Sequence, residues 1–448
     1  MTQVTQSQDE PSSQRVWSNR SFRRLWVAST VSSFGSEVAE LALPLLALVT
    51  LSASATEVGL LRVAQFLPFL LATLPLGLLV DRRRRHRLSL MVGADLGRFL
   101  LVAAIPITVW IGVARIEWLY GVVFAAGILT VLYQIADFAF LPSVVDRAQL
   151  VDANGKISAS QSANEVGGRG LGGLLIQAIS APVAVAVNAV AFLVSALCLR
   201  RIRTNQIDED EVAAAAPSPG PAWREVMEGL RLALHHRYVR PLLGEATTFN
   251  VFNEMFMLGL LIYSVRELGL GPAAIGLVFT AGGVGSFIGA WFGARVTGRF
   301  GYGRVLLVTL IVGNAAPVAV AFLGGVGGTA LGLLCAIFVV MGVGIGIANV
   351  HAVSLRQTAV PEYLRGRVNA AYRLISWGAI PLGAAVGGIV ASQASAQAAM
   401  ITGALGMALA TLWVAFSAVP RLRTISDAGE SAGTDASPSK PSGGSLGT

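Results

Sequence analysis

The stretch that decides the fold covers residues 56–87 and reads TEVGLLRVAQFLPFLLATLPLGLLVDRRRRHR. Its first part is an apolar run of the length, about 20 residues, that a helix needs to cross a lipid bilayer. The run ends at Asp81, and a cluster of arginines follows. Arginine clusters next to apolar runs are typical of cytoplasmic loops. The stretch therefore predicts a transmembrane helix that is followed by a cytoplasmic loop.

The composition of the whole chain agrees with this reading. Of its 448 residues, 54% are hydrophobic and 13% are charged, whereas soluble domains carry roughly 25% charged residues. The net charge of +8 could suggest a nucleic-acid partner. The basic residues instead form short clusters between apolar runs, not a stripe with interleaved aromatic residues, so no nucleic-acid partner is expected.

Apolar runs long enough to span a bilayer recur along the chain, and they predict an all-α polytopic membrane protein with twelve transmembrane helices. The predicted spans are 24–50, 56–80, 88–112, 117–141, 157–178, 181–199, 242–265, 272–296, 304–325, 329–353, 370–392 and 396–418.

The loops predict the orientation. Basic residues gather after every second span, whereas the alternate loops hold little more than Arg115 and Arg266. Because such clusters stay in the cytoplasm, we expect a multi-pass protein of the bacterial cytoplasmic (inner) membrane with both termini inside. The basic clusters contain Arg82 to Arg85, Arg87, Arg147, Lys156, Arg200, Arg201, Arg203, Arg224, Arg299, Arg304, Arg365 and Arg367.

The chain also contains an internal repeat. The sequence from Gly77 to Arg82 matches Ala294–Gly301 at an offset of about 217 residues, Pro142 matches Pro361 at 219, and Gly172-Gly173 matches Gly387-Gly388 at 215. Because these three matches have nearly the same offset, they indicate two parallel six-helix halves related by an axis along the membrane normal.

This repeat gives a predicted domain plan. It comprises a cytoplasmic tail at 1–20, an N-terminal bundle at 21–201, a linker at 202–240, a C-terminal bundle at 241–420 and a disordered tail at 421–448. Within the linker, Trp223 to Tyr238 has helical periodicity and predicts an amphipathic helix at the cytoplasmic membrane surface.

The basic loop after the second span resembles the signature loop of the major facilitator superfamily, in the run Gly77-x-Leu79-Val80-Asp81-Arg82-Arg83-Arg84-Arg85. Within that superfamily the chain is similar to the drug and siderophore exporters typified by macrolide efflux proteins and the enterobactin exporter. The stretches that carry this likeness are Asp95-Leu-Gly-Arg98, Leu141-Pro142-Ser-Val-Val through Ala153-Asn154, and Pro361-Glu-Tyr-Leu-Arg365-Gly366-Arg367-Val. Two positions depart from the family pattern: Arg84 replaces the second glycine of the signature, and Gly167-Gly168 replaces the frequent Gly-Pro of the fifth helix.

The resemblance implies a conformational lock. Asp81 would accept hydrogen bonds from the start of the eleventh helix, near Gly366 and Arg367, where the helix dipole favours an anion. The contact would join the halves in the outward-facing state and break as they rock. The lock residues implied are Gly77, Asp81, Arg82, Arg85, Asp95, Arg98, Gly366 and Arg367.

Carboxylates inside the spans are candidates for the transport mechanism, because a charge in the bilayer is costly. Glu37 and Glu40 share one face of the first helix, and Glu254 follows Glu37 by the repeat offset of 217, with Asn250 one turn earlier. The pattern predicts carboxylates that face a shared cavity and bind protons in competition with a cationic or polar substrate. Alternatively, an arginine or hydrogen bonds between helices neutralise each of them.

Ionisable residues in the fourth and fifth spans allow further readings. Glu165 and Arg169 are i, i+4 neighbours and could form an internal ion pair, or Arg169 could attract an anionic substrate. Asp137 is either a proton relay or a partner of Arg98 or Arg169.

Two other ionisable side chains have simpler expectations. Arg62 lies toward the outer end of the second helix and could extend its guanidinium to the membrane surface. His351 suits a proton step, but a single histidine is more often a packed residue.

Motifs of catalysis are absent from the sequence. It has no metal-ligand cluster, no Gly-x-Ser-x-Gly and no nucleotide-binding loop, so we expect no enzyme activity, no cofactor and an ion gradient as the energy source. The expected function is proton-coupled export of an amphipathic small molecule such as a drug, a siderophore or a secondary metabolite, by alternating access. An importer or uniporter of the same fold, or a non-transporting receptor or assembly factor, are the alternatives. The oligomeric state stays open.

Overall fold

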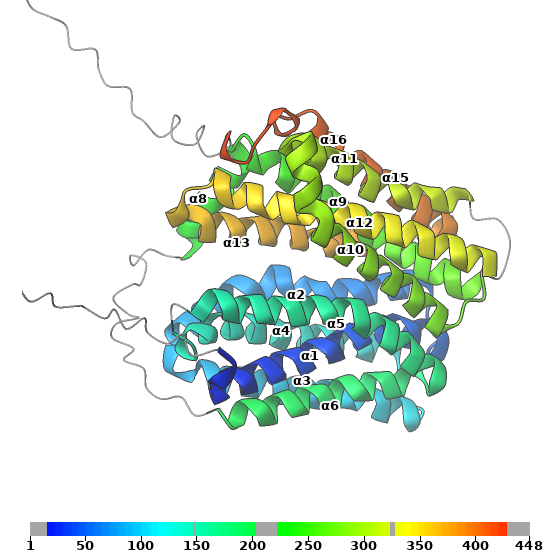
Figure 1. Cartoon of the computed structure of the whole chain (residues 1–448). Helices are drawn as coiled ribbons and strands as arrows, with labels where there is room; N and C mark the ends of the chain where they lie inside the picture. Colours follow the sequence, from blue (N-terminus) through cyan, green and yellow to red (C-terminus); the bar gives the residue numbers. More distant parts are fainter. Residues whose placement is uncertain (1–15, 147–148, 203–221, 323–327, 428–448) are drawn as a thin grey trace, which may run out of the picture.

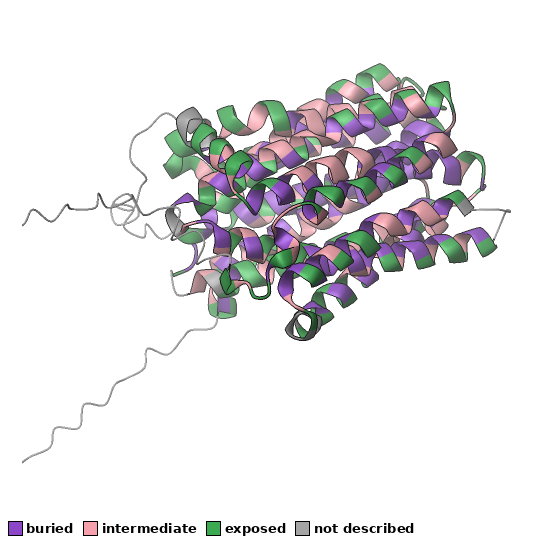
Figure 2. Cartoon of the chain, turned by 90° about the horizontal axis from the view of Figure 1, so that it is seen from above, coloured by how far each residue is buried: buried purple, intermediate pink, exposed green. Residues whose placement is uncertain are grey.

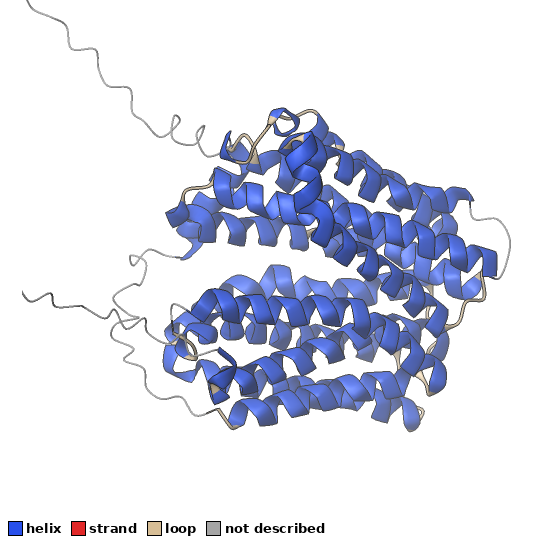
Figure 3. Cartoon of the chain, in the orientation of Figure 1, coloured by secondary structure: helices blue, strands red, loops and turns tan. Residues whose placement is uncertain are grey.

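The computed structural model describes residues 16–146, 149–202, 222–322 and 328–427. Within these ranges the chain is helical and contains no strand (Figure 3). Eleven helical segments are long and apolar enough to cross a membrane, and each coincides with a predicted span. The remaining predicted span, 157–178, lies in the helix α5 (Leu150–Ala178), which is 29 residues long but carries too many polar side chains to be among the eleven.

The helices form two groups, one above the other in Figure 1. The first group contains α1 (Arg20–Leu45), continued by a π-helical turn over Leu46–Thr50, α2 (Ala55–Arg82), α3 (Arg87–Trp110), α4 (Ile116–Phe140), α5 and α6 (Ala181–Arg200). The second contains α8 (Ala222–His235), α9 (Val239–Arg266), α10 (Pro272–Phe300), α11 (Tyr302–Ala315), α12 (Gly328–Ala359), α13 (Glu362–Gly378), α14 (Ile380–Gln393), α15 (Ala396–Ala410) and α16 (Leu412–Ala415). Of the predicted tails at 1–20 and 421–448, residues 1–15 and 428–448 lie outside the described residues, as does the acidic part of the linker.

Large apolar side chains lie exposed on the outside of the bundle. Trp110, Phe138 and Trp291 are 63%, 82% and 64% exposed, and along each helix buried and exposed residues alternate (Figure 2). Apolar surface of this extent is not left in contact with water. It is the surface that lipid covers in a membrane protein.

Two predicted helices differ from the structure in detail. The span 370–392 belongs to a longer segment that begins at Glu362 and is divided into α13 and α14 near Ala379, just before Pro381, which has no N–H to continue the helix. The predicted amphipathic helix is α8, and it packs against α13: Ala233 is buried, and Oε2 of Glu228 accepts from Nη1 of Arg367 at 2.7 Å.

Helix directions alternate, so the arginine-rich segments gather at one end of the bundle. α2 ends at Arg82, α6 ends at Arg200 and α13 starts at Glu362. We call this end, which carries Arg82 to Arg85, Arg200 and Arg367, the basic end. The other end carries the starts of α2 and α10.

At the end opposite the basic end, the two groups touch through paired glycines. A Cβ on Gly59 of α2 would lie 2.9 Å from Cα of Gly388 in α14, and a Cβ on Gly173 of α5 would lie 2.9 Å from Cα of Gly276 in α10. Such distances leave no room for a side chain. The two contacts correspond under the internal repeat, since Gly59 and Gly276 differ by 217 and Gly173 and Gly388 by 215. The chain is therefore closed at this end by backbone-to-backbone packing.

Candidate functional site

Arg62 of α2 is the centre of an ion network that joins the two groups of helices. Its Nε donates to Oε1 of Glu254 in α9 at 2.6 Å, and its Nη2 donates to Oε2 of the same carboxylate at 3.2 Å. Its Nη1 donates to Oε1 of Glu40 in α1 at 2.6 Å, and Gln65 donates to the other oxygen of Glu40 at 2.7 Å. The Arg62 side chain is only 11% exposed. The expectation that it extends to the membrane surface is therefore wrong, because two carboxylates hold it in the interior.

A second ion pair lies in the same region. Nε of Arg169 in α5 donates to Oε2 of Glu37 in α1 at 3.0 Å, and the Arg169 guanidinium lies 5.8 Å from the ring centre of Phe279 in α10. Arg169 thus pairs with Glu37 and not with Glu165 one turn away, so the internal pair considered from the sequence is not formed. Glu165 is exposed and lines a large cavity.

The charges of this cluster do not balance. Three carboxylates, Glu37, Glu40 and Glu254, face two guanidinium groups, Arg62 and Arg169. Each guanidinium neutralises the negative charge of one carboxylate, so one of the three carboxylates remains in excess. Because an uncompensated charge in a poorly solvated site is costly, the cluster favours the uptake of a proton or of a cationic group.

Two cavities lie next to the cluster. The smaller, of about 220 Å³, is lined by both groups of helices, including Glu40, Arg62 and Arg169 from the first and Glu254 and Phe279 from the second. The larger, of about 980 Å³, starts at Arg365 and Gly366 near the basic end and reaches Phe249 and Asn250 on α9. One further turn of α9 leads from Asn250 to Glu254. The larger cavity therefore extends from near the basic end to within one turn of α9 from Glu254, the smaller cavity lies at the charge cluster itself, and the four paired glycines line neither of them.

The wall of the larger cavity contains a carboxylate that the sequence reading overlooked. Glu245 of α9 is buried, and its Oε1 accepts from Nδ2 of Asn314 at 2.9 Å. The position of Glu245 within the predicted span 242–265 indicates a carboxylate inside the membrane. Glu245 lies near the end of that span, however, where a charged side chain usually reaches water. The predicted residue Asn250 also lines this cavity, and its Nδ2 donates to the carbonyl of Ser376 at 2.7 Å.

Three other predicted residues lie inside the first group of helices, away from both cavities. Asp95 and Arg98 form a buried ion pair within α3, and the Arg98 guanidinium stacks on Tyr133 and Phe192 at 4.4 and 4.2 Å. Asp137 accepts from Oγ of Ser29 at 3.3 Å and forms no ion pair with Arg98 or Arg169.

His351 is also held by packing. The residue is buried, its Nδ1 lies 2.8 Å from the carbonyl of Ile347, and its ring centre lies 5.0 Å from that of Tyr302. The interpretation of His351 as a packed residue agrees with these contacts.

We expect Asp95→Ala to destabilise the protein strongly. The change leaves the Arg98 guanidinium, 2% exposed, without its carboxylate, and breaking a buried pair in this way costs about 3–5 kcal/mol. Thermal denaturation in detergent should show a clear fall in melting temperature. The matched control is Asp152→Ala, which removes a pair with Lys156 at the surface and should cost about 0–1 kcal/mol. Equal melting temperatures for the two variants would contradict a structural role for the Asp95–Arg98 pair.

The predicted lock contact between Asp81 and the region of Gly366 and Arg367 is not formed among the described residues. Asp81, Arg82 and Arg85 are exposed, and Asp81 forms no ion pair with any residue in the described ranges. Arg367 pairs with Glu228, and the space beside Gly366 is open. The lock was expected in the state that is closed at the basic end, so it stays a prediction for that state, together with Gly77.

A comparison with protein families decides the identity. The family described as transmembrane secretion effector matches residues 12–436, which is nearly the whole chain. The chain belongs to this family of the major facilitator superfamily. Its members are transporters and not enzymes, so the chain is a multi-pass secondary transporter. This confirms the superfamily that the signature loop indicated, and the resemblance to the macrolide-efflux and enterobactin-exporter type that Asp95–Arg98, 141–154 and 361–368 carried.

Among curated relatives, the multidrug efflux pump Tap of Mycolicibacterium fortuitum is 27% identical over 89% of this chain and 95% of its own length. An uncharacterized MFS-type transporter of Bacillus subtilis (strain 168), YfiS, is 28% identical over 82% of this chain and 86% of its own.

Solved structures confirm the fold of this family member. A point mutant of the nucleoside transporter NupG superposes with a TM-score of 0.69 at 11% identity, covering 92% of this chain and 99% of that one. A bacterial homologue of the iron transporter ferroportin in an inward-facing state superposes with a TM-score of 0.64 at 18% identity, covering 88% and 98%. At these identities the likeness concerns the fold alone.

Proposed function

We propose that the chain is a proton-coupled exporter of amphipathic small molecules that works by alternating access. The observation that carries the proposal is the charge cluster of Arg62, Arg169 and the carboxylates Glu37, Glu40 and Glu254, with one carboxylate in excess. This cluster joins both groups of helices at the inner limit of a cavity that opens at the basic end. The similarity to a multidrug efflux pump supports export as the direction.

The proposed orientation places the basic end, and with it both termini, in the cytoplasm, as the positive-inside rule requires. In the proposed domain plan, 21–201 and 241–420 are the two halves that rock, and 202–240 links them. The conformation described here then opens to the cytoplasm and is closed outward by the glycine contacts.

The cycle follows from the charges. A cationic or polar substrate that enters from the basic end meets the excess carboxylate, and a proton is displaced from it. The bond between Arg62 and Glu254 connects the halves, so it must break or lengthen when they rock. When the site faces outward, a proton that binds the carboxylate releases the substrate, because the neutral acid no longer attracts a cation. Apolar residues beside the cluster, such as Phe66 and Met257, contact the rest of an amphipathic molecule.

We expect Glu37→Gln and Glu254→Gln each to abolish gradient-driven export. Glutamine keeps the size of the side chain and one of its two acceptor oxygens, but its amide cannot bind or release a proton at physiological pH. The measurement is the accumulation of fluorescent dyes and macrolides in an efflux-deficient bacterium that expresses the chain, with and without a protonophore. Wild type should lower accumulation, the protonophore should restore it, and both variants should resemble the empty strain.

The matched control is Glu117→Gln, because Glu117 is exposed at the start of α4 and lies far from the cluster. It should export as wild type does. Dye accumulation that rises on expression would indicate an importer. Export by both glutamine variants at the wild-type rate would overturn the assignment of the proton site.

A further inference from the structure

A groove outside the proposed transport path lies at the basic end, between the start of α9 and the segment that follows α15. Its volume is about 750 Å³. Four basic side chains line it: His235, Arg237, Arg240 and Arg421, and the three arginines are exposed. No aspartate or glutamate is among its lining residues. Within the described ranges, Arg237, Arg240 and Arg421 form no ion pair, so the groove presents uncompensated positive charge.

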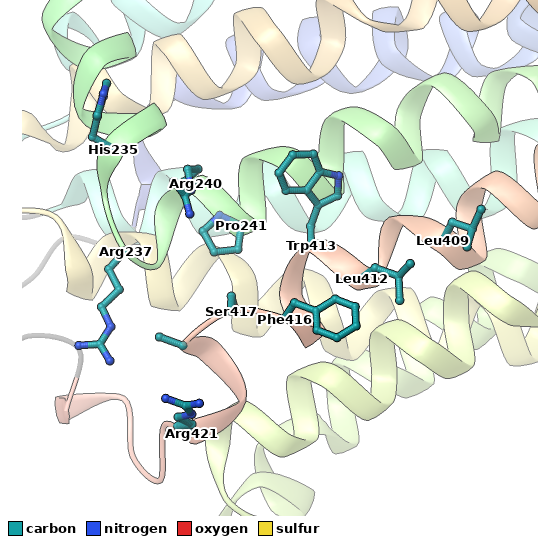
Figure 4. Close-up of a pocket in the computed structure, with 11 residues that line it drawn as sticks. His235, Arg237, Arg240, Pro241, Leu409, Leu412, Trp413, Phe416, Ser417 and Arg421 are labelled. Atoms are coloured by element: carbon teal, nitrogen blue, oxygen red, sulfur yellow. The ribbon is translucent and has the colours of Figure 1, made fainter.

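The other side of the groove is apolar. Leu409, Leu412, Trp413 and Phe416 are 60%, 44%, 50% and 87% exposed. Figure 4 shows the basic side chains gathered toward one side of the pocket and these four apolar side chains toward the other. The groove therefore combines an anion-binding side with an apolar side.

Contacts with α9 fix the position of Trp413 on the apolar side of the groove. Nε1 of Trp413 donates to Oγ1 of Thr248 in α9 at 3.0 Å. A Cβ on Gly244 would come within 2.5 Å of the indole ring, so the ring lies directly against the α9 backbone. These two contacts hold Trp413 against α9. One face of the indole packs on the α9 backbone, and the other face lines the groove.

The order of the residues matches the layers of a membrane. α15 runs toward the basic end, so Leu409 lies deeper than Phe416, and Arg421 lies beyond both. Arg237 and Arg240 lie at the start of α9, at the same end. The apolar wall therefore lies at the depth of acyl chains and the arginines lie at the depth of lipid headgroups. Basic pockets at this depth suit anionic lipid headgroups.

We propose that this groove binds an anionic phospholipid of the leaflet at the basic end. The headgroup phosphate would accept hydrogen bonds from Arg240 and Arg421, with Arg237 at the rim, and an acyl chain would lie along Trp413 and Leu409. The proposal is independent of the transport function. Only the identity of the leaflet as the cytoplasmic one depends on the proposed orientation.

The test is native mass spectrometry of the purified full chain released from micelles that contain equal amounts of phosphatidylglycerol and phosphatidylethanolamine. We expect wild type to retain phosphatidylglycerol at least about fivefold over phosphatidylethanolamine, and the double variant Arg240→Gln/Arg421→Gln to lose at least about fivefold of that retention. Thermal denaturation of both proteins checks that the variant is folded.

The matched control is Arg83→Gln/Arg84→Gln, which removes two exposed arginines from the same end but far from the groove. It should keep the wild-type retention. Equal loss in both double variants would show attraction by general surface charge and overturn the site, as would the absence of any preference in wild type. Displacement of the bound lipid by inorganic phosphate alone would assign the arginines to a free anion and overturn the lipid assignment.

Discussion

Arg62→Gln should reduce the initial transport rate by at least about tenfold and lower the stability of the protein. The guanidinium of Arg62 is the shared partner of Glu40 and Glu254, with three hydrogen bonds of 2.6 to 3.2 Å to their carboxylates. Removing it leaves two poorly solvated carboxylates without a cation, and breaking a buried pair costs about 3–5 kcal/mol. It also removes the ion pair that connects the two halves. Transport by purified protein in vesicles and thermal denaturation in detergent measure the two effects.

Further variants at this site separate charge from geometry. Arg62→Lys keeps the charge but cannot bind Glu254 through two nitrogens, so transport should be intermediate. Arg62→Gln/Glu254→Gln removes the charges of both members of the Arg62–Glu254 ion pair. It should recover part of the stability that Arg62→Gln alone loses. Arg115→Gln, at an exposed arginine outside the network, is the control and should behave as wild type. Normal transport by Arg62→Gln would show that the network is not needed for the cycle.

Gly173→Leu should shift the protein away from the conformation described here. Its Cβ would lie 2.5 Å from the carbonyl oxygen of Pro272 and 2.9 Å from Cα of Gly276. These atoms are backbone and cannot rotate away, so the contact between the halves must open. An overpacked contact costs about 1–3 kcal/mol, which corresponds to a shift of roughly 5- to 150-fold in a two-state equilibrium.

A single cysteine in the large cavity reports the shift. In a protein with Cys198 and Cys335 replaced by serine, Asn349→Cys places a thiol at an exposed position of the cavity wall. With Gly173→Leu, labelling by a membrane-impermeant maleimide from the basic end should slow at least about fivefold. Gly121→Leu is the control, because nothing lies within 4 Å of its Cβ position. Unchanged labelling with Gly173→Leu would refute closure by the glycine contacts.

Much of the architecture could be predicted from the sequence because lipid imposes simple rules. Spans need length and apolarity, and eleven predicted spans meet both conditions in the structure. The repeat offset related Glu37 to Glu254, and the structure finds each of them paired with an arginine. The same offset relates the two glycine contacts, although only Gly173 and Gly388 of the four glycines belong to the glycine pairs that indicate the repeat.

The choice of partners could not be predicted, because it depends on how helices far apart in sequence pack. Neighbour spacing favoured a pair between Arg169 and Glu165, but the packing of α1 against α5 gives Arg169 to Glu37. The position of Arg62 toward one end of its own helix favours a guanidinium that extends to the membrane surface. The contacts with Glu40 of α1 and with Glu254 of α9, 192 residues away, show that Arg62 lies in the interior.

Substrate-dependent proton movement tests the central claim most directly, since the claim is that the excess carboxylate exchanges a proton for a substrate. The purified chain would be placed in vesicles that enclose a pH-sensitive dye, and ethidium or another compound that the cell assay identifies as exported would be added. The account predicts that movement of the compound in one direction drives protons in the other, and that Glu37→Gln shows neither movement. Transport of the compound at the wild-type rate without any change in internal pH would contradict the account.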